Sequence, residues 1–68
     1  MATTDNMTQA EIREAVEWLV HDARYLARWA RIYRARGLPA DAWLAETTRA
    51  NAAHSLSLAR QYRAGLAA

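Results

Sequence analysis

The chain has 68 residues, no cysteine and a formal net charge of +2. A chain of this length holds at most one small domain, and the lack of cysteine excludes a disulfide-stapled mini-protein and a zinc finger. Hydrophobic residues make up 53% of the sequence, but 17 of the 68 residues are alanine, which favours helix and buries little area. No segment approaches the ~20 apolar residues of a membrane span, and an enzyme with a closed pocket is not expected from one copy.

The chain opens with a polar, aperiodic segment, residues 1–7, which we interpret as a flexible tail. This segment has no basic residue before an apolar run, unlike a signal peptide, so we expect a cytoplasmic location. Thr8 and Glu11 then have the spacing of a capping box, in which each residue satisfies the backbone amide of the other. The pattern predicts that a helix begins at residue 8.

The first predicted helix covers about residues 8–36. Its apolar side chains recur in alternating steps of four and three, as in a heptad seam. The members of this seam are Ile12, Val16, Leu19, Ala23, Leu26, Ala30 and Tyr33.

A turn is predicted at residues 37–39, where Gly37 can adopt the left-handed conformation that ends a helix. Pro39 suits the first turn of the next helix, expected over about residues 40–65, and Asp41 would lie at the positive end of its dipole. The seam expected along this helix is less bulky, and Gly65 is expected to let the helix end fray. Its members are Leu44, Thr48, Asn51, Ser55, Leu58 and Tyr62, flanked by Ala45, Ala52, Ala59 and Leu66.

Two long helices joined by so short a turn must run antiparallel, so residues 8–68 are expected to form one all-α helical hairpin. Asn51 falls within the second seam, where a polar side chain can fix register and oligomeric state or hydrogen-bond a ligand. We favour the role in register.

A second stripe of large side chains lies on the first helix, about 110° from the seam. Its members are Trp18, Tyr25, Trp29 and Ile32. A single partner helix covers one stripe, so we expect self-association, most simply into a homodimeric four-helix bundle or else into a higher helical oligomer. The residues expected in the oligomer core are Ile12, Val16, Trp18, Leu19, Leu26, Ile32, Leu44, Leu58 and Tyr62.

Charge is divided along the first helix, with acids first and arginines last. Up to Asp22 the helix holds Glu11, Glu14, Glu17 and Asp22 against Arg13 alone, and the arginines that follow extend toward the turn, namely Arg24, Arg28, Arg31, Arg34 and Arg36. If two first helices packed antiparallel about a two-fold axis near His21, Glu14 would face Arg28 of the other copy. Further pairs would follow in the same arrangement, namely Glu11 with Arg31 and Glu17 with Arg24. Acids first and bases last is also the order that the helix dipole favours for solvated charges.

No catalytic or metal-binding constellation is evident, and no cofactor is expected. His21 and His54 lie on different helices without an orienting acid, and there is no glycine-rich phosphate loop. Arginines interleaved with aromatic residues are the better candidate for function, because this combination binds phosphates, stacked bases and protein surfaces. The candidate partner-binding residues are Arg24, Tyr25, Arg28, Trp29, Arg31 and Tyr33. The same pattern also fits a solvated outer face beside core aromatics.

The segment from Met7 to Glu11, followed by two heptad helices and a tight turn, resembles the Rop family of plasmid RNA-regulating proteins. The resemblance implies an antiparallel four-helix dimer that binds paired RNA loops through the outer faces of its first helices. On that face this chain has Arg13, Glu17, Arg24, Arg28 and Arg31. In size and helicity the chain is also similar to small helical-hairpin proteins of phages and mobile elements, which occupy a host protein or sequester a nucleotide.

These observations favour a small, non-catalytic regulatory or inhibitory protein that binds another protein through its first helix. The alternative is a helical bundle that binds RNA or sequesters a nucleotide with the same arginines.

Overall fold

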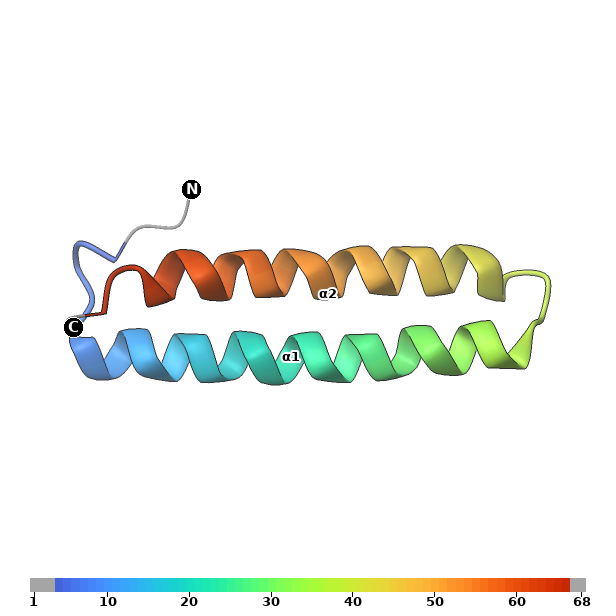
Figure 1. Ribbon diagram of the computed structural model, residues 1–68, viewed down its shortest axis with the longest axis horizontal. Helices are drawn as coiled ribbons and strands as arrows, with labels where there is room; N and C mark the ends of the chain where they lie inside the picture. Colours follow the sequence, from blue (N-terminus) through green and yellow to red (C-terminus); the bar gives the residue numbers. More distant parts are fainter. Residues whose placement is uncertain (1–3, 67–68) are drawn as a thin grey trace.

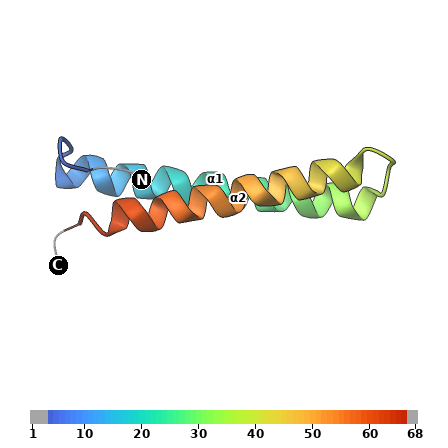
Figure 2. The same cartoon turned by 90° about the horizontal axis from the view of Figure 1, so that it is seen from above.

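The computed structural model describes residues 4–66, which form two α-helices packed side by side (Figure 1). Helix α1 spans Gln9–Arg36 and helix α2 spans Asp41–Arg63. They run antiparallel in a hairpin of 45 × 18 × 16 Å, and Figure 2 shows that their axes cross. The predicted all-α hairpin is therefore confirmed, as a single layer of two helices.

The capping box at the start of α1 forms as predicted. The Thr8 hydroxyl accepts a hydrogen bond from the Glu11 backbone N–H at 3.1 Å, and the Glu11 carboxylate accepts one from the Thr8 N–H at 2.9 Å. The Thr8 backbone amide, and after it the hydroxyl, lower the pKa of Glu11 below its ordinary value. This end of the helix is thus fixed by local sequence alone.

Gly37 ends α1 in the left-handed conformation that the sequence predicts, with φ 68° and ψ 24°. Its N–H donates to the carbonyl of Tyr33 at 3.2 Å. Helix α2 begins one residue later than expected, at Asp41, and Ala40 before it makes no side-chain cap. The Asp41 side chain bonds Arg36 and the Leu38 amide, as described below.

The seam predicted along α1 is the face that meets α2. Four of its members are buried and the other three are half-buried. The buried residues are Ile12, Val16, Ala23 and Ala30, and the half-buried residues are Leu19, Leu26 and Tyr33.

Helix α2 contacts α1 through Ser55 of the predicted seam and through the alanines predicted to flank that seam, and the leucines of the seam lie beside the contact. The buried residues of α2 are Asp41, Ala45, Ala52, Ser55 and Ala59. Small side chains let two helix backbones approach closely, so the contact turns toward them and away from the leucines. Consequently Leu44, Leu58 and Tyr62 are only half-buried, and Asn51, expected in the seam, is exposed.

The open end of the hairpin is closed by the segment before α1. Residues 4–7 form a turn in which the Met7 N–H donates to the Thr4 carbonyl at 3.0 Å, while residues 1–3 of the predicted tail lie outside the described residues. Thr4 packs so closely on Gly65 that a Cβ atom there would overlap it, and the Gln9 side-chain amide donates to the Gly65 carbonyl at 3.1 Å. Gly65 therefore makes room for Thr4 and follows the end of α2 at Arg63, which is two residues earlier than the predicted end at about residue 65.

Candidate functional site

A groove on the outer side of α1 brings together four of the six candidate partner-binding residues. It is lined by His21, Arg24, Tyr25, Arg28 and Arg31. All five are exposed, and the Tyr25 side chain has a relative exposure of 53%. These residues recur at intervals of three and four because that spacing keeps side chains on one face of a helix. We call this surface the arginine groove.

The arginines of the groove carry uncompensated charge within the part of the chain that the structure describes. None of Arg24, Arg28 and Arg31 forms an ion pair with a described carboxylate. Guanidinium groups in this state keep all their donors available for carboxylate or phosphate oxygens, which they bind in a planar, bidentate geometry.

The remaining two candidates, Trp29 and Tyr33, lie half-buried beside the groove. The ring of Tyr25 meets that of Trp29 edge-on, with 6.4 Å between centroids, and the Trp29 and Tyr33 centroids lie 5.7 Å apart. The Arg36 guanidinium continues this row at 5.3 Å from the centre of the Tyr33 ring. The candidates thus divide into an exposed groove and an aromatic row, and Tyr25 belongs to both.

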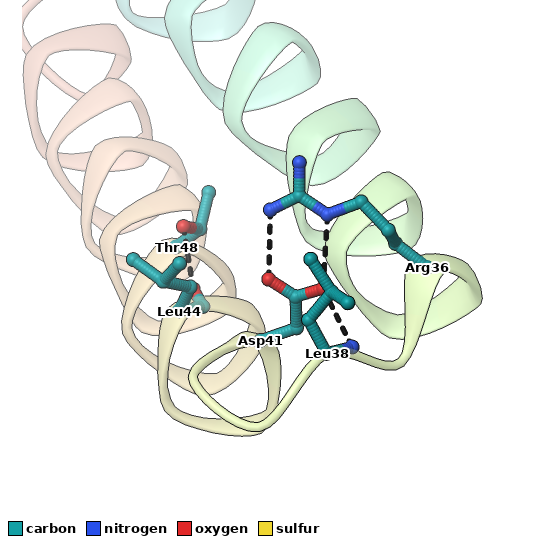
Figure 3. A network of polar contacts seen from close by, with 5 residues as sticks. All are labelled: Arg36, Leu38, Asp41, Leu44 and Thr48. Carbon is teal, nitrogen blue, oxygen red and sulfur yellow. Dashed lines mark hydrogen bonds and ion pairs between the residues drawn. The ribbon is translucent and has the colours of Figure 1, made fainter.

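Arg36 binds Asp41 across the turn, a contact that the sequence interpretation did not foresee (Figure 3). Its Nε and Nη2 atoms donate to the two carboxylate oxygens at 2.9 and 2.8 Å, and the Leu38 N–H donates to the same carboxylate at 2.9 Å. Asp41 is buried, with 1% relative exposure. The Arg36 guanidinium is therefore held at the turn by Asp41. It does not extend the row of unpaired arginines toward the turn, as the sequence had predicted.

The same contacts set the protonation of the pair. The Arg36 guanidinium lowers the pKa of the Asp41 carboxyl, burial opposes this effect, and the Leu38 amide adds to it. In return the carboxylate raises the pKa of Arg36. The ion pair is thus the favoured state of both groups.

A second unforeseen contact joins the middle of the two helices. The Ser55 hydroxyl donates to the Asp22 carboxylate at 2.9 Å, and Ser55 is buried. This pair occupies the place in the contact that Asn51 was expected to take. In the sequence, Ser55 is visible as a serine within a stripe of alanines. Its partner Asp22 could not be predicted without knowing the register of the two helices.

Three of the four members of the second stripe of α1 are exposed in the single chain, whereas Trp29 is half-buried. The relative exposure is 65% for Trp18 and 40% for Ile32. On α2, Trp43 is exposed to 69%. Large apolar side chains are thus left open on both helices.

The two histidines do not come together. His21 packs edge-on against the Trp18 ring at a centroid distance of 6.0 Å, whereas His54 is exposed on α2. Within residues 4–66 no three histidine or acidic side chains gather in a way that could hold a metal ion.

Comparison with protein-family models, with curated proteins and with solved structures finds no match to this chain. Neither described helix combines the length and the hydropathy that crossing a membrane requires. The candidate site therefore rests on the geometry of the arginine groove.

Proposed function

We propose that the chain is a small regulatory or inhibitory protein that acts in the cytoplasm by binding another protein through the arginine groove. The observation that carries this proposal is the exposure of Tyr25 among three arginines without ion pairs. Tyrosine and arginine are enriched among the residues that dominate binding energy at protein interfaces. The groove thus offers the Tyr25 ring for apolar contact and, around it, guanidinium groups that can donate charge-assisted hydrogen bonds.

The charge of the groove matches a partner with an acidic surface patch around an apolar contact. Arg24 and Arg31 are seven residues apart, which is about 10 Å along a helix. Toward the start of α1 the outer face continues with Glu14 and Glu17 and with one further arginine, Arg13. A short basic patch bordered by acids suits a local acidic site better than the longer phosphate track of RNA.

The proposal can be tested by affinity capture from a lysate of the source cells. The bait variant replaces both Arg24 and Arg31 with alanine, and the matched control replaces Arg60 and Arg63, two exposed arginines in the last turn of α2. Both double variants remove two positive charges, so they differ only in where charge is lost. Quantitative mass spectrometry of bound proteins and sequencing of bound RNA provide the readout.

We expect a specific protein that is retained by the wild type and the control, is lost with the Arg24 and Arg31 variant, and persists after nuclease treatment. RNA that depends on the same arginines and is released steeply between low and physiological salt would favour the alternative function instead. A captured protein that both double variants retain equally would show that the arginine groove is not the binding site.

A further inference from the structure

Three large apolar side chains form an exposed row along the outer side of α1. They are Trp18, Tyr25 and Ile32, with relative exposures of 65%, 53% and 40%. Each lies seven residues after the one before it, so the row keeps to one side of the helix over about 21 Å. Apolar side chains at this interval form the contact line of helices that pack as coiled coils. We call these three residues the outer row.

Charged side chains border the outer row, and their sign changes along it. Glu14 and Glu17 line a groove with Trp18, and Arg13 is the one arginine of that groove. The arginine groove follows along the helix, and His21 lines both grooves, so the two form one continuous surface. The first half of this surface is therefore acidic on balance, and the second half is basic.

The acidic half is open to a partner in the same way as the arginine groove. Glu14 and Glu17 are exposed, and neither forms an ion pair with a described residue. The Trp18 ring meets only the edge of the His21 ring among the described aromatic side chains, at a centroid distance of 6.0 Å. A lysine or arginine of a partner can pack its aliphatic stem or its cationic head on such a ring while it donates to the carboxylates.

A second copy of α1 does not match this surface. In an antiparallel pair about a two-fold axis, opposite charges face each other when the axis lies near His21. The outer row faces itself only when the axis lies at Tyr25, its middle member, and an axis near His21 sets Trp18 against Arg24 instead. A parallel pair would place like charges side by side. The surface therefore fits a helix of a different protein.

We propose that the outer row and its flanking charges bind one amphipathic helix of the partner protein, which runs antiparallel to α1. Apolar side chains of that helix cover the outer row, acids in its first half meet the arginine groove, and bases in its second half meet Glu14 and Glu17. Acids first and bases last is the order that the dipole of the partner helix favours, and this order selects the antiparallel direction. The proposal rests on the proposed function and specifies which element of the partner the arginine groove meets.

The docking of such a helix is tested with a designed peptide of about 21 residues, three heptads long. The peptide has leucine at the apolar heptad positions, glutamate beside them in its first half and lysine beside them in its second half. A comparison peptide has the same composition, with glutamate and lysine alternating from end to end. Fluorescence anisotropy of each labelled peptide, titrated with the purified chain, gives its dissociation constant. The charge-divided peptide should bind about tenfold tighter or more.

Two tryptophan variants locate the peptide on the chain. Trp18→Ala should weaken binding of the charge-divided peptide about tenfold or more, because exposed tryptophans commonly dominate the energy of an interface. Trp43→Ala is the matched control, since Trp43 lies on α2 with a similar exposure of 69%, and it should leave binding unchanged. Circular dichroism of both variants separates loss of binding from loss of helix.

A charge variant tests the acidic half of the surface. Glu14→Lys combined with Glu17→Lys should abolish the preference for the charge-divided peptide over the alternating one, because the bases of the peptide then meet like charges. A preference that persists in this double variant would show that the acidic half takes no part in binding, and it would overturn the proposed arrangement.

The direction of the bound helix is measured with a nitroxide label at the first residue of the charge-divided peptide. In the antiparallel complex the label should broaden the backbone amide signals of residues near Arg31 and leave those near Ala10 sharp. The reverse pattern would overturn the antiparallel direction.

The proposal would be overturned if neither peptide bound more tightly than about 100 µM, or if Trp18→Ala and Trp43→Ala weakened binding equally. A dimer of the chain that Trp18→Ala dissociates in sedimentation would show that a second copy covers the outer row, which would also overturn it. The capture experiment separates this proposal from the proposed function. A protein lost with the Arg24 and Arg31 variant but retained by a Trp18→Ala bait would leave the proposed function standing and overturn the docking on the outer row.

Discussion

Asp41 shows how a single buried carboxylate can organise a turn. Its two oxygens take three hydrogen bonds, two from Arg36 at the end of α1 and one from the Leu38 amide within the turn. A buried charge without such partners would be strongly destabilising. The carboxylate therefore ties the end of one helix to the start of the next, in addition to favouring the dipole of α2.

Replacing Asp41 with asparagine should lower the thermal midpoint at neutral pH and reduce the loss of stability in acid. The pKa of Asp41 is lower in the folded chain than in the unfolded chain. Its ionised form therefore stabilises the fold above the unfolded value of about 4, and this contribution is lost as the pH falls through the lower folded value. Melting curves from pH 7 to pH 2.5 measure both effects.

The matched control is Glu46→Gln, because Glu46 pairs with Arg49 on the exposed side of α2. Exposed pairs contribute little to stability, so this variant should follow the wild type at each pH. If the melting temperatures of Asp41→Asn and the wild type fell by the same amount in acid, this result would contradict the role given to Asp41.

Gly37 illustrates a different local requirement, that of backbone conformation. Its φ is 68°, and a Cβ atom added there would meet nothing within 4 Å. Gly37→Ala should thus cost about 1–2 kcal/mol through the left-handed backbone alone. Gly37→Asn should cost less, since asparagine tolerates this conformation better. Chemical denaturation measures the free energy of unfolding of each variant. Equal losses for Gly37→Ala and Gly37→Asn would indicate a steric cause instead.

At the scale of elements, α2 is the smoother helix and α1 carries most of the bulk. The close contact depends on the alanines of α2, of which Ala52 is 6% exposed. This explains why the contact centres on the alanines predicted to flank the seam, and why Leu44 and Leu58 of the seam are only half-buried.

Ala52→Leu should destabilise the hairpin by about 1–3 kcal/mol, because added methylenes push the two backbones apart. The neighbouring Ala53 is exposed, so Ala53→Leu should stay within about 0.5 kcal/mol of the wild type. Urea unfolding of the two variants provides the comparison. Similar losses for both would mean that the contact between helices is not as close as described.

Local sequence was sufficient to predict the elements, and it failed where the answer depends on how the helices meet. The Thr8 capping box and Gly37 could be read directly, because each acts within a few residues. The rotation of α2 and the Asp22 bond to Ser55 depend on register between segments that are 33 residues apart. The arginine groove was foreseen in part, because its members share one helix face. The pairing of Arg36 with Asp41 could not be foreseen, because it depends on the geometry of the turn.

At the scale of the whole molecule, Trp29 connects the candidate binding surface with the self-association that the sequence predicts. Its ring packs against the rings of Tyr25 and Tyr33, and the side chain is half-buried. Trp29→Ala should lower both self-association and the stability of the chain, the latter by about 2 kcal/mol, near half the cost for a fully buried tryptophan.

Sedimentation and thermal melting of Trp29→Ala measure the two properties, with Trp29→Phe as the variant that keeps an aromatic ring. If alanine leaves both properties unchanged but abolishes capture of a partner, the aromatic row is a recognition surface and not part of the core.

Three of the polar links between described segments lie at different heights along the hairpin. Gln9 reaches Gly65 at the open end, Asp22 meets Ser55 near the middle, and Arg36 holds Asp41 at the turn. A force applied to the two chain ends would therefore load these links one after another, as in a zipper, instead of all together. The hairpin should therefore separate first at its open end and last at the turn.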